Sequence, residues 1–492
     1  GGAHDIVGVT LAGSPAVVAG STTRVAWGFT NSYGDWSDLV ILESEGDRYL
    51  TPDGPRPFDR VAETIVVRGS EPVVFEIRST IWGPVIDEDH LGRARALRWI
   101  AHEPEAANLA LLDLEHAADL EGALAVATTV GMPPQNFVCA DAGGRIGWTI
   151  IGRIPKRRGF SGAVPASWAD GSRGWDGWVA PEEAPRIVDP PDGILWSANN
   201  RTTSGDVLAV LGDGGHDLGA RARQIRDGLL ALSDADEGDM LALQLDDRAL
   251  LHERWRALAL EALGDDAVAG QARRALFRDL VRDTWTGRAS TGSTAYRLVR
   301  AFRRETFERV YGRLMAPCQA ADERFDIDHF GQWEDSLWRL VSERPAQLLG
   351  PGETGWESEL LAAVDAVMAH LVDEAGPDPE LWTWGRRNTL RMRHPLSRAV
   401  PQLASRLDMA PVELPGDGHM PRVQSAAFGA SERFAVSPGR ESDGYFHMPG
   451  GQSGHPLSPY YRAGHGDWAA GRATPFLPGA TATTLTLVPA GG

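Results

Sequence analysis

The sequence predicts an α+β protein in which β-rich segments flank a mainly helical block. Residues 1 to about 160 carry alternating or continuous β-branched runs that are bounded by Gly, Pro and Asp. Residues from about 218 to 375 carry apolar side chains at helical spacing, and the tail from about 380 returns to strands and loops. Strands and helices that are separated along the chain in this way are typical of layered α+β proteins.

The N-terminal region contains several short strand patterns, among them residues 6–10 and 73–77. A helix over about 120–128 is expected to interrupt them. The turn sequence at 141–144, Asp-Ala-Gly-Gly, then predicts a hairpin that residues 145–151 complete.

The helical block shows two apolar stripes with the spacing i, i+4, i+7 and i+11, which predicts helices that face a core. They are formed by Leu251, Trp255, Leu258 and Ala262, and by Leu360, Val364, Val367 and Leu371. Residues 483–488, Thr-Thr-Leu-Thr-Leu-Val, predict a terminal strand.

The composition excludes several classes of partner and chemistry. The net charge of −19 over 492 residues argues against nucleic acid or an anionic membrane surface as a partner. No run of about 18 apolar residues is present, so no transmembrane helix is expected. The only lysine is Lys156, and catalysis by lysine is therefore excluded unless Lys156 performs it.

Neither the two cysteines nor the first residues indicate in which cellular compartment the protein works. Cys139 and Cys318 are too few for a disulfide framework; they can pair, or each can be a small buried residue, and the apolar run around Cys139 favours burial. No signal peptide is found, and the chain opens at Gly1 in mid-motif, so we expect a truncated start.

A polar loop between two strand patterns is the first candidate site. Residues 27–39 read WGFTNSYGDWSDL, and loops held between strands often carry functional groups. Asp35 and Asp38 can offer oxygen ligands to a hard cation such as Ca²⁺. Spacing alone favours the alternative, a solvated hairpin loop.

This loop and four later stretches, in the same order, resemble the large β subunit of penicillin acylase-type N-terminal nucleophile hydrolases. The four are PQNF at 134–137 with Ala140-Asp141, SANNR at 197–201, GDGH at 416–419 and GGQSGHPLS at 450–458. The resemblance covers nearly the whole chain. It implies an αββα sandwich with a mainly helical insertion: a β-rich core over 1–217, the insertion over 218–375 and a return to the core over 376–492.

The resemblance also implies the chemistry. Family members hydrolyse linear amides with the N-terminal serine of the β subunit, which self-cleavage of a precursor exposes. Its α-amine titrates near neutrality, at about 7.7–8.0, and so serves as the general base. That serine is expected a few dozen residues before the loop and is missing from this chain, as is the separate α subunit.

By resemblance, three residues belong to the catalytic site and one to the acyl pocket. The side-chain amide of Asn199 would donate to the tetrahedral oxyanion, and the backbone N–H of Asn31 would be the second donor. Arg221 would orient a substrate carboxylate or hold Asn199, and Tyr33 would line the acyl pocket. The alternatives are a turn-forming Asn199, a half-buried aromatic Tyr33 and, with equal weight, a helix-surface Arg221.

A structural calcium ion is the one cofactor that the resemblance implies. Asp35 and Asp38 match its ligands, Pro165 is a weaker candidate through its backbone carbonyl, and the remaining ligand would come from the α subunit. The family also implies a periplasmic or secreted location.

Two other features are weaker candidates. Ser453 lies in Gly-Gln-Ser-Gly-His, which is not the G-x-S-x-G pattern of serine hydrolases. The histidines of the tail lack the ligand spacing of a zinc site; they are His419, His447, His455 and His465.

The expected function is therefore hydrolysis of N-acyl groups on small molecules: β-lactams, acyl-homoserine lactones, lipopeptides or N-acyl amino acids. The first alternative is a non-catalytic binding or structural protein that has lost its nucleophile. The second is a carbohydrate-active protein, which 17 Trp against 7 Tyr suggest, although no carboxylate pair stands out.

Overall fold

The computed structural model describes residues 5–327, 331–486 and 488. The chain forms two compact units: unit one comprises residues 1–226 and 315–344, and unit two comprises residues 227–314 and 345–492. The three-part domain division expected from the sequence follows a different partition and stays a prediction.

Unit one contains a six-stranded antiparallel sheet, which includes the strand that leads into the candidate loop of residues 27–39. Its order is β1 (Val7–Val9), β2 (Ala19–Ser21), β3 (Val25–Asn31), β12 (Gln135–Asp141), β13 (Ile146–Ile151) and β17 (Arg186–Val188). The register places Gln135 opposite Asn31 and Asn136 opposite Thr30. Two of the sequence motifs therefore lie side by side although about a hundred residues separate them.

The hairpin predicted over 135–151 is confirmed. Asp141 closes its turn because its Oδ1 accepts hydrogen bonds from the backbone N–H groups of Gly143, at 2.9 Å, and Arg145, at 3.1 Å. The aspartate thus satisfies turn donors that no strand partner reaches.

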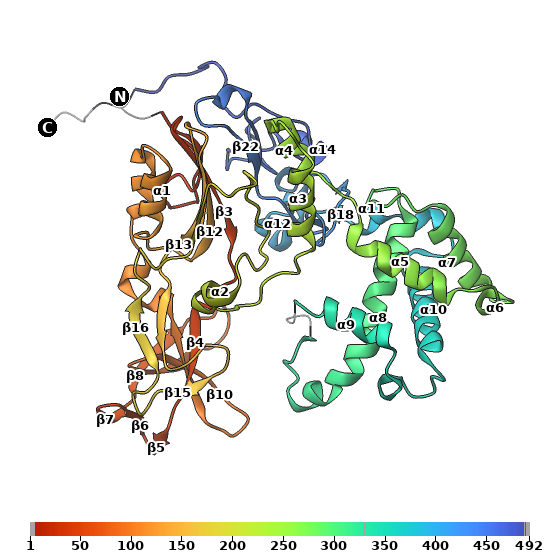
Figure 1. The fold of residues 1–492 in the computed structure, drawn as a ribbon, viewed down its shortest axis with the longest axis horizontal. Helices are drawn as coiled ribbons and strands as arrows, with labels where there is room; N and C mark the ends of the chain where they lie inside the picture. Colours follow the sequence, from red (N-terminus) through yellow and green to blue (C-terminus); the bar gives the residue numbers. More distant parts are fainter. Residues whose placement is uncertain (1–4, 328–330, 487, 489–492) are drawn as a thin grey trace. The chain divides into compact units, whose positions relative to one another are not determined.

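Helix α1 (Leu120–Ala127) confirms the predicted helix and covers one face of this sheet, packing on β12 and β13 (Figure 1). Asp119 caps it by accepting from the Gly122 N–H at 2.9 Å. The apolar side of α1 packs into a core that the sheet completes with Val25, Trp27, Phe137 and Cys139, all almost fully buried. Burial of this apolar surface is what holds helix and sheet together.

The second sheet of unit one has the order β15 (Ala166–Ser167), β4 (Ser37–Ile41), β11 (Ala94–Trp99), β10 (Gly83–Glu88), β9 (Val73–Thr80) and β8 (Asp59–Ile65). Only β15 runs parallel to its neighbour β4 in this sheet. Two smaller sheets adjoin it: β5 (Ser44–Glu45), β6 (Arg48–Thr51) and β7 (Gly54–Pro57), and β14 (Pro155–Arg158) with β16 (Gly174–Trp178).

Short helices complete unit one. They are η1 (Ile100–His102), η2 (Pro104–Ala106), η3 (Ala110–His116), α2 (Gly205–Leu211) and α9 (Glu334–Glu343). Two longer helices, α3 (Ala220–Leu230) and α8 (Thr294–Ala321), extend from one unit into the other along the chain.

Unit two holds most of the helical block. Its helices are α4 (Glu237–Gln244), α5 (Leu250–Ala262), α6 (Asp265–Val268), α7 (Ala272–Asp283), η5 (Ala346–Leu348), α10 (Trp356–Ala375), η6 (Pro379–Leu381), α11 (Trp384–Arg387), α12 (Pro395–Ala399), η7 (Pro401–Leu403), α13 (Ala404–Leu407), η8 (Glu441–Asp443) and α14 (His465–Ala470). Three pairs of short strands lie among them: β18 (Thr389–Leu390) with β19 (Val412–Glu413), β20 (Gln424–Ser425) with β21 (Phe428–Gly429), and β22 (Arg433–Ala435) with β23 (Tyr445–His447).

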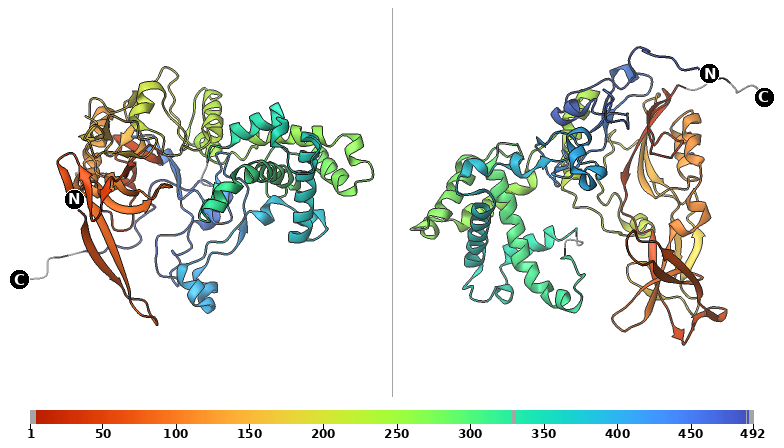
Figure 2. Two further views of the ribbon diagram at one scale, coloured as in Figure 1. Left: turned by 90° about the horizontal axis from the view of Figure 1, so that it is seen from below. Right: turned by 180° about the vertical axis from the view of Figure 1, so that it is seen from behind.

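The two predicted apolar stripes are confirmed as core faces. Helices α5, α7 and α10 pack against one another (Figures 1 and 2). The stripe of α10 is buried throughout, and Trp255, Leu258 and Ala262 of α5 are buried while Leu251 is half-buried.

The terminal strand predicted over residues 483–488 is wrong where it can be checked. Residues 483–486 form no strand, and Leu487 lies outside the described residues. Both cysteines are free: Cys139 is buried, as the sequence favoured, whereas Cys318 is exposed. None of the helices within the described ranges is long and apolar enough to cross a membrane.

Candidate active site

The candidate loop connects β3 to β4, and a second segment of unit one holds it in place. The Asp35 N–H donates to the carbonyl of Leu211 at 2.8 Å, and the Gly214 N–H donates to the carbonyl of Tyr33 at 2.9 Å. The approach at Gly214 is close: a Cβ there would lie 2.4 Å from the carbonyl oxygen of Gly34. We call residues 31–38 the site loop.

The carbonyl oxygen of Asn31 is the point where three of the sequence motifs meet. It accepts from Nδ2 of Asn199 at 3.1 Å and from Nδ2 of Asn136 at 3.2 Å. Trp148 Nε1 donates to Oδ1 of Asn136 at 3.0 Å and so fixes how that amide is turned. The hydroxyls of Thr30 and Ser197, 2.8 Å apart, tie the same two segments together.

Asn199 is held from its other side by Arg221 on α3. Nη2 of Arg221 donates to Oδ1 of Asn199 at 2.9 Å, so the amide oxygen faces the guanidinium and the NH₂ group faces Asn31. Asp217 orients Arg221, accepting from its Nε at 3.1 Å and also from Nη2. Asn199 has a φ of 64°, a left-handed conformation that asparagine tolerates better than most residues.

A pocket of about 360 Å³ opens beside the site loop. Its lining is mainly apolar and includes Asn31, Tyr33, Trp36, Trp99, Ile100 and Met132. Tyr33 lines this pocket, with 42% of its surface exposed and a left-handed φ of 47°. A cavity with apolar walls and a few polar groups at one edge is typical of a small-molecule site.

The two carboxylates of the site loop are bound to an arginine of β14. Arg157 Nε donates to Oδ2 of Asp38 at 2.9 Å, and Nη2 lies 3.1 Å from Oδ2 of Asp35. Burial raises the pKa of Asp35 to about 6, and the Arg157 charge opposes that rise.

The residues present do not fit a calcium ion unless Arg157 is displaced, because its guanidinium takes up oxygens that the metal would need. Pro165 immediately precedes β15, which pairs Ala166 with Val40 of β4, so the chain at Pro165 runs beside the strand that carries Asp38. Within residues 5–327, 331–486 and 488, no group of three or more His, Cys, Asp and Glu side chains could hold a metal. Calcium binding stays an expectation from the resemblance, and the contacts of Arg157 with Asp35 and Asp38 argue against it.

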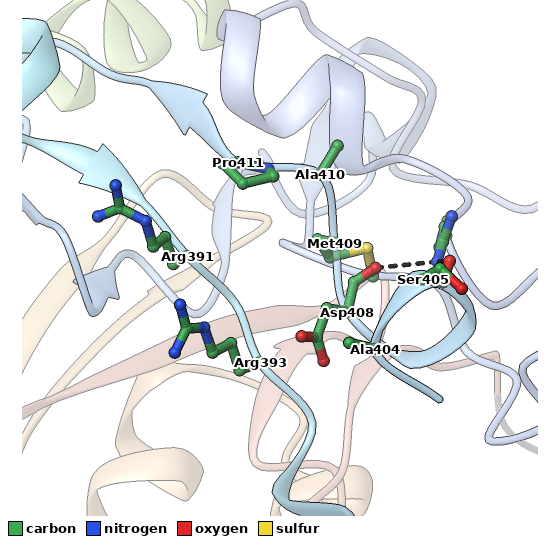
Figure 3. A pocket seen from close by; sticks show the side chains of 9 residues that line it. Arg391, Arg393, Ala404, Ser405, Asp408, Met409, Ala410 and Pro411 are labelled. Atoms are coloured by element: carbon green, nitrogen blue, oxygen red, sulfur yellow. Dashed lines mark hydrogen bonds between the residues drawn. The ribbon is translucent and has the colours of Figure 1, made fainter. Parts of the chain in front are cut away.

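A second pocket, in unit two, lacks the groups for amide hydrolysis. Figure 3 shows Arg391 and Arg393 across it from Asp408. Asp408 Oδ1 accepts from the backbone N–H of His394 at 2.9 Å, so this carboxylate has a structural partner. Its lining residues offer positive charge and the Ser405 hydroxyl, but they include no histidine or lysine that could act as the base for that hydroxyl.

The other sequence candidates of unit two have local structural partners. Oγ of Ser453 accepts from the backbone N–H of His455 at 3.2 Å, which is a turn within the glycine-rich loop. His447 is buried, and its Nε2 bonds to the backbone carbonyl of Arg472.

Asn31 and Tyr33 thus line the pocket, and Asn199 and Arg221 are linked to Asn31 by hydrogen bonds. Asn136 contacts Asn31, Asp217 contacts Arg221 and Arg157 contacts Asp38, and the sequence alone does not predict a role for these three partners. Asn136 lay inside a quoted motif, and Asp217 lies four residues before Arg221, a helical spacing that could have suggested the pair. Arg157 gave no signal, because it is one of two adjacent arginines far from the site loop in sequence.

The chain is similar to proteins of one known family. The penicillin amidase family model matches residues 1–483. An acyl-homoserine lactone acylase of Pseudomonas aeruginosa is 27% identical over 96% of this chain and 62% of that protein. A penicillin acylase 2 proenzyme of Pseudomonas sp. (strain SE83) is also 27% identical, over 96% of this chain and 61% of that protein.

Among solved structures, a thermostable penicillin G acylase from Alcaligenes faecalis superimposes with a TM-score of 0.72 at 20% identity, covering 99% of this chain and 92% of that chain. This confirms the α+β N-terminal nucleophile hydrolase fold. The chain spans about three fifths of the length of the curated relatives that it matches. With its family model matched over nearly its whole length, the chain belongs to the penicillin amidase family.

Proposed function

We propose that this chain provides the oxyanion site and acyl pocket of an amide hydrolase that removes N-acyl groups from small molecules. The observation that carries the proposal is the orientation of Asn199. Its NH₂ group carries two hydrogens; one is donated to the carbonyl of Asn31, a residue that lines the pocket. In our proposal the second hydrogen is donated to the substrate oxyanion.

The chemistry proceeds through an acyl-enzyme. The hydroxyl of an N-terminal serine, supplied by a segment outside this sequence, attacks the amide carbonyl while the serine's α-amine takes up the proton. Collapse of the tetrahedral intermediate breaks the C–N bond, and the amine leaves with a proton. Water then hydrolyses the serine ester and releases the carboxylic acid.

In this scheme the residues of this chain stabilise charge and position groups. Asn199 Nδ2 and the Asn31 backbone N–H donate to the oxyanion, whose stabilisation by one donor is worth about 3–4 kcal/mol. Arg221 acts through Asn199 by holding the amide oxygen. The apolar pocket beside Tyr33 takes the acyl chain.

The substrate class follows from this pocket and from the relatives. One relative is named for acyl-homoserine lactones and another for penicillin, which are both N-acyl compounds. β-Lactams, acyl-homoserine lactones, lipopeptides and N-acyl amino acids therefore form the substrate panel.

The partners are proposals of the same kind. A relative named as a proenzyme supports a processed precursor, and hence an α subunit from the same precursor as the partner. A periplasmic or secreted location rests on the family alone.

The test uses the full-length protein from the same gene, with fatty-acyl and phenylacetyl amides as chromogenic substrates. We expect cleavage of the precursor before a serine, visible by intact-mass spectrometry, followed by amide hydrolysis. A fully folded protein that neither processes itself nor hydrolyses any member of the panel would establish the alternative, a non-catalytic member of the family.

A further inference from the structure

The Asp38 carboxylate is buried and yet has two strong donors. Its side chain is 2% exposed, and its Oδ2 accepts from Arg157 Nε at 2.9 Å and from Trp175 Nε1 at 2.6 Å. A carboxylate removed from water is stable only when it is hydrogen-bonded and its charge is compensated. Asp38 therefore depends on the charge that Arg157 brings.

The Arg157 side chain is buried to a similar degree and contacts both Asp35 and Asp38. Its side chain is 7% exposed, and Nη2 contacts the Asp35 carboxylate at 3.1 Å and the Asp35 backbone carbonyl at 3.0 Å. One guanidinium thus contacts oxygens of two carboxylates and one carbonyl, the oxygen types that bind Ca²⁺ in proteins.

Two glycines leave the space that this arrangement occupies. A Cβ at Gly162 would lie 2.5 Å from Oδ2 of Asp35 and 2.6 Å from Nε of Arg157. A Cβ at Gly212 would lie 2.5 Å from Cβ of Asp35. Both have positive φ, 86° and 68°, so the backbone also favours glycine there. The surroundings are shaped around the Asp35–Arg157 pair.

A divalent cation would compete with Arg157 for the same place. Ca²⁺ takes about six to eight oxygen ligands, and the guanidinium already binds three of the oxygens that Asp35 and Asp38 offer. Two cationic groups within a few ångströms also repel each other strongly in a buried setting.

We propose that Arg157 takes the place of a divalent cation in this chain, so that a side chain rather than a metal ion neutralises Asp35 and Asp38 and fixes the site loop. The site loop then forms without calcium. This inference holds whether or not the protein hydrolyses amides, and its tests read stability and metal binding.

The first experiment needs no mutation of the arginine. The full-length protein is titrated with Tb³⁺, a luminescent substitute for Ca²⁺. Excitation of Trp175, which contacts Asp38, would transfer energy to a Tb³⁺ ion bound there. In a separate measurement, the melting temperature is determined in EDTA and in CaCl₂. We expect equal Tb³⁺ emission from the wild type and Asp38→Asn, and one melting temperature in both buffers. Sensitised emission that Asp38→Asn abolishes, with a melting temperature that EDTA lowers and Ca²⁺ restores, would overturn the proposal.

The second experiment compares two arginines of the same strand. Arg157→Gln removes the buried charge, whereas Arg158→Gln removes an arginine that is 46% exposed and pairs with Asp176, itself 51% exposed. We expect Arg157→Gln to melt several degrees below the wild type and Arg158→Gln to melt within about 1 °C of it, as surface pairs contribute little. Equal melting of Arg157→Gln and the wild type would contradict the proposal.

The third measurement asks whether the charge is what matters. Millimolar CaCl₂ should raise the melting temperature of Arg157→Gln and leave Arg158→Gln unchanged. If the Arg157→Gln protein folds but CaCl₂ does not raise its melting temperature, Arg157 does not take the place of a metal ion. If Arg157→Gln does not fold, the Tb³⁺ and EDTA measurements on the wild type still decide.

Discussion

At the scale of single residues, the site depends on which way one amide is turned. Arg221 bonds to Oδ1 of Asn199, and an amide that is held at its oxygen can only present its nitrogen to the other side. Asp217 in turn fixes the guanidinium. Arg221 is therefore a positioning residue, and its two partners require the planar fork that lysine lacks.

Replacing Arg221 tests this role. Arg221→Ala should lower kcat for amide hydrolysis about 10- to 100-fold, as expected for a lost hydrogen bond to a charged group, with KM nearly unchanged. Arg221→Lys should recover only part of kcat. An increase in KM at constant kcat would instead mean that Arg221 contacts the substrate, which was the other sequence-based interpretation.

Some residues of the site could be predicted from the sequence, and Arg157 could not. Asn31, Tyr33, Asn199 and Arg221 could be named because the resemblance to the family covers their segments, whereas spacing alone favoured a solvated loop over residues 27–39. Arg157 could not, because its contact with Asp38 spans 119 positions and the neighbouring Arg158 has the same chemistry. The register of β14 with β16 decides which of the two arginines faces inward. The local sequence does not predict that register.

At the scale of elements, the site loop is held by the last residue of α2 and the segment that follows it, as well as by β3 and β4. Backbone hydrogen bonds from Asp35 to Leu211 and from Gly214 to Tyr33 join the two segments. The close approach at Gly214 makes this contact sensitive to any side chain.

Gly214→Ala should therefore destabilise the protein by about 1–3 kcal/mol, the usual range for an overpacked site, and should lower activity as Tyr33 and Asn31 shift. Gly219→Ala is the matched control, because a Cβ there meets nothing within 4 Å. Its effect should stay within about 0.5 kcal/mol. Urea unfolding of both variants measures the difference, and equal stability would show that the contact is not restrictive.

Elements with a local cause were predictable from sequence. Helix α1 has an Asp119 cap and an apolar face, and the β12–β13 hairpin has an Asp-Ala-Gly-Gly turn. The segment 483–486 has strand-like composition but forms no strand. β-Propensity reflects packing against neighbouring strands, and the segment alone does not reveal whether a neighbour exists.

At the scale of the whole molecule, stability also depends on a buried charge network in unit two. Asp417, 4% exposed, accepts from the Tyr296 hydroxyl at 2.6 Å and from Nε of Arg300. Burial would raise the pKa of Asp417, but the Arg300 charge and these hydrogen bonds hold it far below its usual range. A depressed folded-state pKa means that the network stabilises the protein above the unfolded-state pKa, near 4, and is lost as the pH falls below it.

Asp417→Asn should accordingly lower the free energy of unfolding by about 2–3 kcal/mol at pH 7, because the hydrogen bonds to a charged carboxylate are lost, while the Arg300 side chain, 38% exposed, keeps contact with solvent. The deficit should shrink as the pH falls below 4, because the unfolded wild type then binds a proton at Asp417 that the folded protein does not yet bind. Asp443→Asn, an exposed aspartate, is the control and should show no comparable deficit. A deficit for Asp417→Asn that is the same at pH 7 and pH 3 would contradict the electrostatic origin.

The fold as a whole was predicted at the level of class and family, because five ordered motifs extend over nearly the full length. How residues 227–492 divide into short helices and two-residue strands was not. Those elements depend on long-range packing, as between α5, α7 and α10, more than on local pattern.

The most direct test of the site compares two neighbouring asparagines in the full-length enzyme. Asn199 carries the amide that contacts Asn31. The Asn200 side chain instead bonds within its own turn: its Oδ1 accepts from the Ala198 N–H at 3.0 Å, and its Nδ2 donates to the Arg201 carbonyl at 2.8 Å. Asn199→Ala should reduce kcat about 10²- to 10³-fold with folding and KM preserved, and Asn200→Ala should retain most of the activity. If both variants lose activity equally, or if Asn199→Ala hydrolyses amides at the wild-type rate, the oxyanion site lies elsewhere.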